Sequence, residues 1–171
     1  MNVLVTGGLG FIGSHVVDVL LERGHKVTIL ERHSREIENR GNSRVDYYLG
    51  DITDKEPMWD AIVNTDGVIN LAGILGTAET VGTAQNSVDV NVLGALNVFD
   101  AVKQYNKKAV HITVGNYTWN NTYAITKYAS ERFALMYNRE FGTKIAVVRG
   151  LNVYGPRQKH APVRKVVPNF I

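Results

Sequence analysis

The sequence predicts an α/β fold in which a mostly parallel sheet carries helices on both of its faces. Short apolar segments rich in β-branched residues alternate with amphipathic helical segments along the chain. This order is typical of parallel strands joined by crossover helices. In addition, Gly7, Gly10 and Gly13 lie between the first strand segment and the first helical segment. Glycines are expected at that turn if the backbone must approach a ligand closely.

Taken in order, the elements follow from the apolar pattern and from residues that end helices. The expected strands are 2–6, 26–31, 45–49, 67–72, 109–113 and 144–149. The expected helices are roughly 10–23, 54–64, 83–105 and 122–141, with Gly24, Asn64 and Gly142 at their C-terminal ends. Thr53 and Glu56 have the spacing of a capping box. The polar segment 34–44 is expected to be a surface loop.

Composition limits the class of protein. The 171 residues allow one domain with a sizeable core, and 44% apolar with 20% charged residues is ordinary for a globular chain. No run of about 18 or more apolar residues occurs and no basic leader precedes the first strand, so we expect no membrane span, no signal peptide and a cytoplasmic location. The chain has no cysteine, which excludes disulfides and thiolate metal sites, and we expect no metal.

The net charge of +3 is modest, but basic residues gather near the C-terminal end. They are Arg157, Lys159, His160, Arg164 and Lys165. A solvated surface and an anion site are both open interpretations of this group. No aromatic-rich basic stripe accompanies it, so we expect no nucleic-acid partner.

The glycine loop predicts a dinucleotide site. A helix N-terminus carries unpaired N–H groups and partial positive charge, which suit a pyrophosphate. Gly7 would permit the turn, Gly10 the close approach of the backbone, and Gly13 the packing of helix on strand. The spacing is G-x-x-G-x-x-G rather than the usual G-x-G-x-x-G. An ordinary glycine-rich turn is the alternative.

The ends of the second and third strands indicate which dinucleotide. Glu31 ends the second strand, where a carboxylate would hold the ribose hydroxyls of NAD and repel the extra phosphate of NADP. NAD is therefore favoured. Asp51 and Ile52 follow the third strand and are placed to contact adenine, although Asp51 could instead be a turn or cap residue. Three basic residues that could accept the NADP phosphate follow Glu31: Arg32, His33 and Arg35.

Tyr123 and Lys127 form a second candidate group. They are four residues apart and share one face of a helix. A tyrosine has a pKa of about 10, and acting as a base near neutral pH requires a fall of roughly 3 units, or about 4 kcal/mol. Lys127 and a cationic nicotinamide could supply it. Thr113, at the end of the fifth strand, could hold the substrate oxygen or be a plain strand residue. His111 fits a satisfied strand histidine better than a catalyst.

Five motifs in this order resemble the extended short-chain dehydrogenase/reductases, and within them the NAD-dependent nucleotide-sugar epimerase/dehydratase group. The motifs are TGGLGFIG, NLAG, NVLGALNV, YAITK and RGLNVYGPRQ. The resemblance implies a Rossmann-type, doubly wound domain over residues 1–150 that binds NAD. Residues 151–171 would then begin a substrate-binding lobe that is truncated or minimal.

The resemblance also implies roles for individual residues. Cofactor contacts would come from Gly7, Gly10, Phe11, Ile12, Gly13, Glu31, Arg32, Asp51, Ile52, Leu71, Ala72, Gly73, Tyr123 and Lys127. Asn91 would also contact the cofactor and would support the architecture of the site from its helix. Thr113, Tyr123 and Lys127 would be catalytic, and Thr113 and Asn152 would contact a nucleotide-sugar substrate. Tyr117 matches the tyrosine of the family's VYG segment.

Family members act by transient hydride abstraction at a sugar hydroxyl carbon, so an epimerase is the leading prediction. A net dehydrogenase or reductase, a catalytically weak NAD-binding module, and a cofactor half that needs a partner chain are the alternatives. A homodimer through the helices carrying Asn91 and Tyr123 is expected. Two departures matter: Val114 and Gly115 stand where C4–C6 dehydratases carry an acidic pair, and only residues 114–122 separate Thr113 from Tyr123. The family also usually extends well beyond the final VVPNFI.

Overall fold

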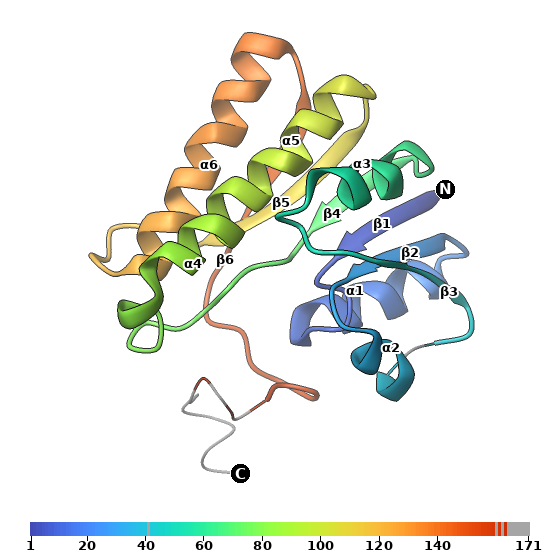
Figure 1. Ribbon diagram of the computed structural model, residues 1–171, viewed down its shortest axis with the longest axis horizontal. Helices are drawn as coiled ribbons and strands as arrows, with labels where there is room; N and C mark the ends of the chain where they lie inside the picture. Colours follow the sequence, from blue (N-terminus) through green and yellow to red (C-terminus); the bar gives the residue numbers. More distant parts are fainter. Residues whose placement is uncertain (41, 160, 162, 164–171) are drawn as a thin grey trace.

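A six-stranded parallel sheet forms the centre of the computed structural model, which describes residues 1–40, 42–159, 161 and 163 (Figure 1). The strands are β1 (Asn2–Thr6), β2 (Lys26–Glu31), β3 (Val45–Leu49), β4 (Gly67–Asn70), β5 (Lys108–Val114) and β6 (Lys144–Gly150). Their order across the sheet is β3-β2-β1-β4-β5-β6. This is the Rossmann-type order, with its switch point between β1 and β4. His160, Arg164 and Lys165 of the basic group lie outside the described residues.

Helices cover the sheet on both faces, as the alternating pattern predicts. The helices are α1 (Phe11–Glu22), α2 (Ser34–Arg40), α3 (Lys55–Val63), α4 (Ala84–Val88), α5 (Gly94–Gln104) and α6 (Thr122–Phe141). Val3, Val5 and Ile29 face α1 and α2 in one apolar cluster. Leu4 and Val68 face α3, α5 and α6 in the other, larger cluster. Alternate residues of one strand therefore enter opposite cores, as the pleat requires.

The expected loop at 34–44 is wrong for its first part. Residues Ser34–Arg40 form α2, and Ile37 packs against the cluster that contains Val27 and Ile29. The segment is rich in arginine and glutamate, which are good helix formers. One apolar contact is enough to dock so short a helix, and a single isoleucine in a polar stretch gives no periodicity to detect.

The expected helix at 83–105 is confirmed in its extent, but it is not a uniform α-helix. It consists of a 3-10 turn η1 (Val81–Thr83), α4, a π-helical turn η2 (Asp89–Leu93) and α5, which follow one another without a break. The π turn contains Asn91, whose side chain bonds the backbone of Ile74 through both its oxygen and its nitrogen. Single π turns inside α-helices often occur at functional sites.

The ends of the helices are partly as expected. Gly24 and Gly142 have φ of +76° and +63°, the left-handed conformation that ends a helix with little cost for glycine. The capping box at Thr53 and Glu56 is absent, because α3 is capped by Asp54 and Thr53 binds Asp51 instead. No helix in the described part of the chain has the length and apolar character needed to cross a membrane.

Candidate functional site

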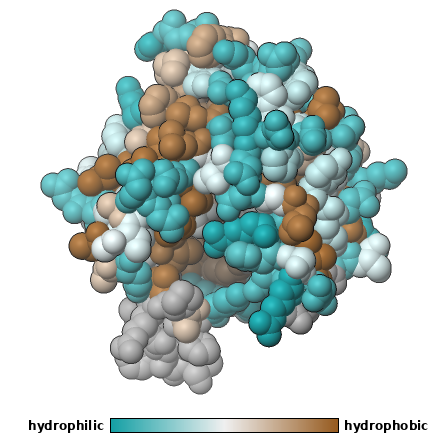
Figure 2. All heavy atoms as spheres, viewed as in Figure 1, coloured by the Kyte–Doolittle hydropathy of each residue, from teal (hydrophilic) through white to brown (hydrophobic). Residues whose placement is uncertain are grey.

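A cavity of about 500 Å³ opens at the carboxyl ends of the strands. Figure 2 shows this face of the molecule hollowed near its middle, with recessed apolar surface between hydrophilic borders. Nine of the residues expected at a cofactor line the cavity: Gly7, Gly10, Phe11, Glu31, Arg32, Asp51, Ile52, Ala72 and Gly73. These residues come from the ends of β1, β2, β3 and β4, so the topology brings them to one edge of the sheet.

The glycine loop is built as the spacing predicts. Gly7 has φ of +69°, and a Cβ there would lie 3.0 Å from the backbone nitrogen of Ala72. A Cβ at Gly13 would collide with the carbonyl oxygen of Gly7. Gly10 caps α1 without a side-chain hydrogen bond. The first turn of α1 therefore meets the cavity with backbone amides that no capping side chain occupies.

The second-strand carboxylate is held in a defined orientation. Glu31 Oε1 accepts hydrogen bonds from the backbone N–H groups of Arg32 (3.0 Å) and His33 (3.2 Å). The guanidinium of Arg32 lies 3.9 Å from a carboxylate oxygen of Asp51. The other Asp51 oxygen accepts from both the backbone N–H and the hydroxyl of Thr53 at 2.9 Å. Asp51 therefore fixes the turn and also lines the cavity, so its place in the turn does not exclude a contact with a cofactor.

Lys127 lies immediately behind the cavity wall. A Cβ on Gly73, which lines the cavity, would be 3.6 Å from Lys127 Nζ and 2.9 Å from Asn91 Oδ1. Burial lowers the pKa of Lys127 to about 8. Burial also raises the pKa of Tyr123 above its ordinary value. The protein by itself therefore keeps the Tyr123 phenol protonated near neutral pH.

Asn91 ties the cavity wall to α6. Its Nδ2 donates to the carbonyl of Ile74 and to the hydroxyl of Thr126, each at 3.0 Å, and its Oδ1 accepts from the N–H of Ile74 at 2.8 Å. All its polar atoms are thus used by the protein, and the residue is 1% exposed. It lies outside the lining of the cavity, in a supporting position.

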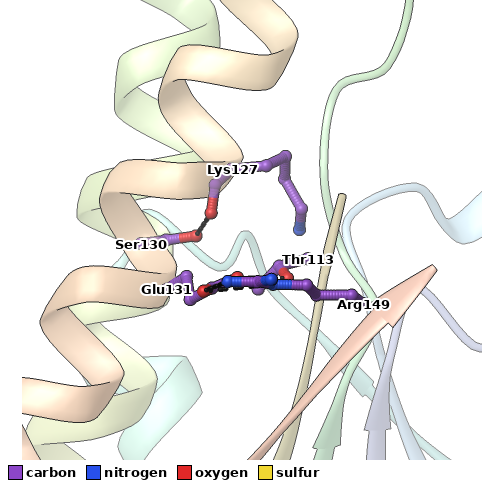
Figure 3. Close-up of polar contacts among 5 residues, drawn as sticks. All are labelled: Thr113, Lys127, Ser130, Glu131 and Arg149. Carbon is purple, nitrogen blue, oxygen red and sulfur yellow. Dashed lines mark hydrogen bonds and ion pairs between the residues drawn. The ribbon is translucent and has the colours of Figure 1, made fainter. Parts of the chain in front are cut away.

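Thr113 belongs to a polar cluster that the sequence analysis did not find (Figure 3). Its hydroxyl donates to Glu131 Oε2 at 2.9 Å, and Arg149 donates to the same carboxylate through Nε and Nη2. The Arg149 hydrogen bonds are the main cause of a lowered Glu131 pKa. The Arg149 guanidinium also lies 4.3 Å from the ring centre of Tyr117. Glu131 could have been found, since it follows Lys127 by four residues and so shares its helix face.

His111 is a satisfied strand histidine, as expected, at the centre of a buried chain of hydrogen bonds. The Thr6 hydroxyl donates to Asn70 Oδ1 (2.6 Å), and Asn70 Nδ2 lies 3.1 Å from His111 Nδ1. His111 Nε2 lies 3.0 Å from the Ser130 hydroxyl, which donates to the Lys127 carbonyl. The directions agree if Nδ1 accepts and Nε2 donates. Burial, with a smaller effect of Lys127, lowers the His111 pKa to about 3.

Several expected residues lie outside the cavity lining. They are Ile12, Gly13, Leu71, Asn91, Thr113, Tyr123, Lys127 and Asn152. Gly13 and Leu71 pack the loop, while Asn152 is exposed. Conversely, Gln158 and Lys159 line the cavity, although the sequence motifs assign neither of them to a cofactor. The described residues contain no group of three or more His, Cys, Asp or Glu side chains placed to hold a metal.

Comparison with known proteins agrees with this geometry. The model of the NAD dependent epimerase/dehydratase family matches residues 3–171. A UDP-glucose 4-epimerase from Thermotoga maritima, solved with UDP-glucose, is 33% identical, with a TM-score of 0.91 over 99% of this chain and 62% of that one. A Thermus thermophilus UDP-glucose 4-epimerase, solved with NAD, is 32% identical, with a TM-score of 0.85 over 94% of this chain and 58% of that one.

Among curated relatives, a UDP-N-acetyl-alpha-D-glucosaminuronate decarboxylase from Bacillus cytotoxicus is 30% identical over 98% of this chain and 59% of its own length. The chain thus spans about three fifths of the length of the relatives it matches. The family model covers nearly the whole sequence, including the glycine loop and the Tyr123–Lys127 helix. The chain belongs to the NAD-dependent epimerase/dehydratase family.

Proposed function

We propose that the chain binds NAD in the cavity and uses it for transient oxidation of a nucleotide-sugar hydroxyl, as an epimerase. The observation that carries the proposal is the convergence of the glycine loop, Glu31 and Asp51 on one cavity whose wall, Gly73, adjoins Lys127. The chemistry of these residues fits NAD. Backbone amides suit a diphosphate. A Cβ at Gly10 would crowd the Gly7 carbonyl oxygen at 3.0 Å, so glycine fits this position in the loop best.

The charges around the ribose site favour NAD over NADP. The Glu31 carboxylate is fixed by two backbone N–H groups and would repel a phosphate on the adenosine ribose. The Arg32 guanidinium, which follows Glu31 in the sequence, lies 3.9 Å from a carboxylate oxygen of Asp51, and its charge is partly balanced there. These contacts support the prediction of NAD as the cofactor.

NAD⁺, when bound, supplies an acceptor for the hydride on the carbinol carbon. Tyr123 is then the group that takes the hydroxyl proton at its phenol oxygen. Its pKa is raised by burial, so the cationic cofactor and Lys127 must together lower it before it can act as a base. Lys127, with a pKa of about 8, is mainly cationic at neutral pH and can favour the phenolate.

Thr113 would hold the substrate oxygen beside Tyr123. Its single donor is already used on Glu131, so the hydroxyl can only accept a hydrogen bond from the substrate. Thr113 is 2% exposed, and the proposal therefore requires the turn after β5 to admit the sugar. Asn152 remains a predicted contact of the substrate diphosphate.

The decarboxylase relative and the dehydratases of the family define the alternatives. A C4–C6 dehydratase needs an acid and a base near the sugar, and Val114 and Gly115 provide neither. The buried carboxylate close to Thr113 is Glu131, but Arg149 and Thr113 occupy its oxygens. Epimerase chemistry, which needs no further acid or base, is therefore favoured over dehydration. A net dehydrogenase would use the same residues.

Comparison of Tyr123→Phe with Tyr128→Phe tests the proposal. Tyr128 lies on the same helix, but its ring stacks on Tyr117 and it has no predicted role in the chemistry. With UDP-glucose and NAD, the wild type is expected to form UDP-galactose without net accumulation of NADH. Tyr123→Phe should lose at least about 100-fold in rate and Tyr128→Phe should not. Steady NADH release identifies a dehydrogenase, and equal rates for all three proteins contradict the catalytic role.

We also propose a homodimer through η2 and α6. Leu93, Ile125 and Phe133 are 48%, 54% and 36% exposed on these neighbouring elements, and a second copy could cover them. Ile125→Lys is expected to give a monomer in light scattering while the wild type gives a dimer. A monomeric wild type at high concentration contradicts this assembly. Division into a cofactor domain, 1–150, and the beginning of a substrate lobe, 151–171, remains a prediction.

A further inference from the structure

The segment Gly155–Lys159 lies across the N-terminal part of α1 and is attached there by two polar contacts. His15 Nε2 lies 3.0 Å from the carbonyl oxygen of Pro156, to which it can donate. Arg157 Nη1 lies 2.7 Å from Asp18 Oδ2. His15 and Asp18 are three residues apart on α1, so both contacts hold the segment against one face of this helix.

The turn within this segment has an unusual residue at its third position. The N–H of Gln158 donates to the carbonyl of Gly155 at 3.3 Å, which closes a β-turn with Pro156 and Arg157 in the middle. Arg157 has φ of +68°, in the left-handed region where glycine or asparagine is usual. A strained arginine is kept there, and its side chain reaches Asp18. The turn is therefore held in a particular orientation at some conformational cost.

That orientation directs Gln158 and Lys159 to the cavity, which both of them line together with the glycine loop. Gln158 Oε1 is buried and has no hydrogen-bond partner among the described residues. Its Nε2 donates to the carbonyl of Val153 at 3.4 Å, which assigns the oxygen as the free atom. A buried acceptor without a donor is costly, and because Gln158 lines the cavity, its oxygen indicates a ligand that donates.

We propose that Gln158 and Lys159 are additional cofactor-binding residues and that the Arg157–Asp18 ion pair positions them. Gln158 Oε1 accepts a hydrogen bond from a hydroxyl or amide N–H of NAD, because diphosphate oxygens only accept. The Lys159 ammonium pairs with the diphosphate. The inference rests on the proposed binding of NAD in this cavity. It adds the segment after β6 to the binding site, although Gln158 and Lys159 do not lie at the end of a strand.

Calorimetric titration with NAD and with ADP tests the two contacts. Gln158→Leu is expected to weaken NAD binding about tenfold, the effect of about one lost hydrogen bond. Gln104→Leu, on the exposed end of α5, is the control and should bind as the wild type does. Lys159→Gln should weaken both NAD and ADP several-fold at low salt, with the difference shrinking as salt is added. Unchanged affinities in both cavity variants overturn the proposal.

A charge exchange tests the positioning role. Asp18→Arg and Arg157→Asp should each raise the dissociation rate of NAD several-fold, and the double variant should restore it. The pair is 38% and 44% exposed, so the melting temperature should change little in any of them. Single variants with wild-type dissociation rates contradict the positioning role, as does a double variant that stays impaired.

The outcome for the wild type separates this inference from the proposed function. A wild-type chain that binds neither NAD nor ADP contradicts the proposed function and this inference with it. A wild type that binds NAD, with variants that bind it equally well, contradicts this inference alone.

Discussion

The two halves of the sheet build their parts of the site in different ways. In the β1–β3 half, the cavity is formed by backbone at Gly7 and Gly10 and by side chains at strand ends such as Glu31, which is partly exposed. In the β4–β6 half, the important groups are titratable side chains buried between the sheet and α6. They include His111 at 1% and Lys127 and Glu131 at 3% exposed.

The two halves therefore differ in how much free energy their functional groups cost the folded protein. Glycines and solvated carboxylates perturb a fold little once the turn is formed. Buried titratable groups cost free energy unless they are neutral or paired. His111 is kept neutral, Glu131 is paired with Arg149, and Lys127 has a lowered pKa. We therefore expect substitutions of buried titratable groups in the β4–β6 half to change stability with pH. In the β1–β3 half, we expect substitutions of the carboxylates at the strand ends to change mainly ligand binding, and substitutions of tightly packed loop glycines to change stability at every pH.

The largest expected effect is acid destabilisation through His111. Unfolded His111 takes up a proton below pH 6.5, whereas the folded protein resists this until about pH 3. Its contribution to stability is therefore complete above pH 6.5 and is lost as the pH falls, by up to about 5 kcal/mol. His111→Gln should remove this part of the pH dependence in urea unfolding, while the exposed His33→Gln should keep it. Identical pH profiles for the wild type and His111→Gln would show that the buried histidine does not cause the acid destabilisation.

Gly13→Ala should have the largest effect in the glycine half. A Cβ at this position meets only backbone, at Gly7 and Gly8, so the loop must move. We expect a loss of about 3 kcal/mol in unfolding free energy, together with loss of NAD binding. Gly82→Ala is the matched control, because no atom lies within 4 Å of its Cβ position. Equal stability and NAD affinity in the two variants would remove the packing role assigned to Gly13.

Lys127→Met is expected to stabilise the protein while it abolishes turnover. Lowering the lysine pKa from 10.5 to about 8 corresponds to about 3 kcal/mol at pH 7. This cost is present below pH 8 and disappears as the pH rises through 10.5, so the gain from methionine should disappear there too. Chemical unfolding at pH 7 and pH 10.5 measures it. Lys144→Met, at an exposed position, should not increase the unfolding free energy. A Lys127→Met variant that is less stable than the wild type at pH 7 would contradict a free-energy cost of burying the charged lysine.

The smallest effect on stability is expected at Glu31. Glu31→Gln removes the charge but can keep an oxygen for the two backbone N–H groups. Unfolding free energy should change by less than about 0.5 kcal/mol. The affinity for NADP relative to NAD should rise about tenfold, because the repulsion of the extra phosphate is lost. An unchanged NAD/NADP ratio would show that this carboxylate does not select the cofactor.

The same contrast explains how much the sequence could predict. The glycine loop, Glu31 and Asp51 could be placed together at one edge of the sheet, where they line the cavity, because strand ends and turn glycines are local features whose places in a parallel sheet are fixed by topology. Every end of a strand was placed within two residues for the same reason. Tyr123 and Lys127 were placed on one helix, α6, through their helical spacing.

The buried cluster could not be predicted in this way. The contacts of Glu131 with Thr113 and Arg149 join α6, β5 and β6, and only the assembled fold brings these elements together. Asn70, His111 and Ser130 likewise come from three elements. Gln158 was missed because its position depends on a strained turn at Arg157 and an ion pair to α1, neither of which leaves a local pattern.

The most direct test of the account is a crystal structure of the chain with bound NAD. We expect the diphosphate on the backbone amides at the start of α1, the adenosine ribose on Glu31, and the nicotinamide on the side of Gly73 where Lys127 lies, within reach of the Tyr123 phenol. NAD bound elsewhere, or a nicotinamide remote from the Tyr123 phenol, would contradict it.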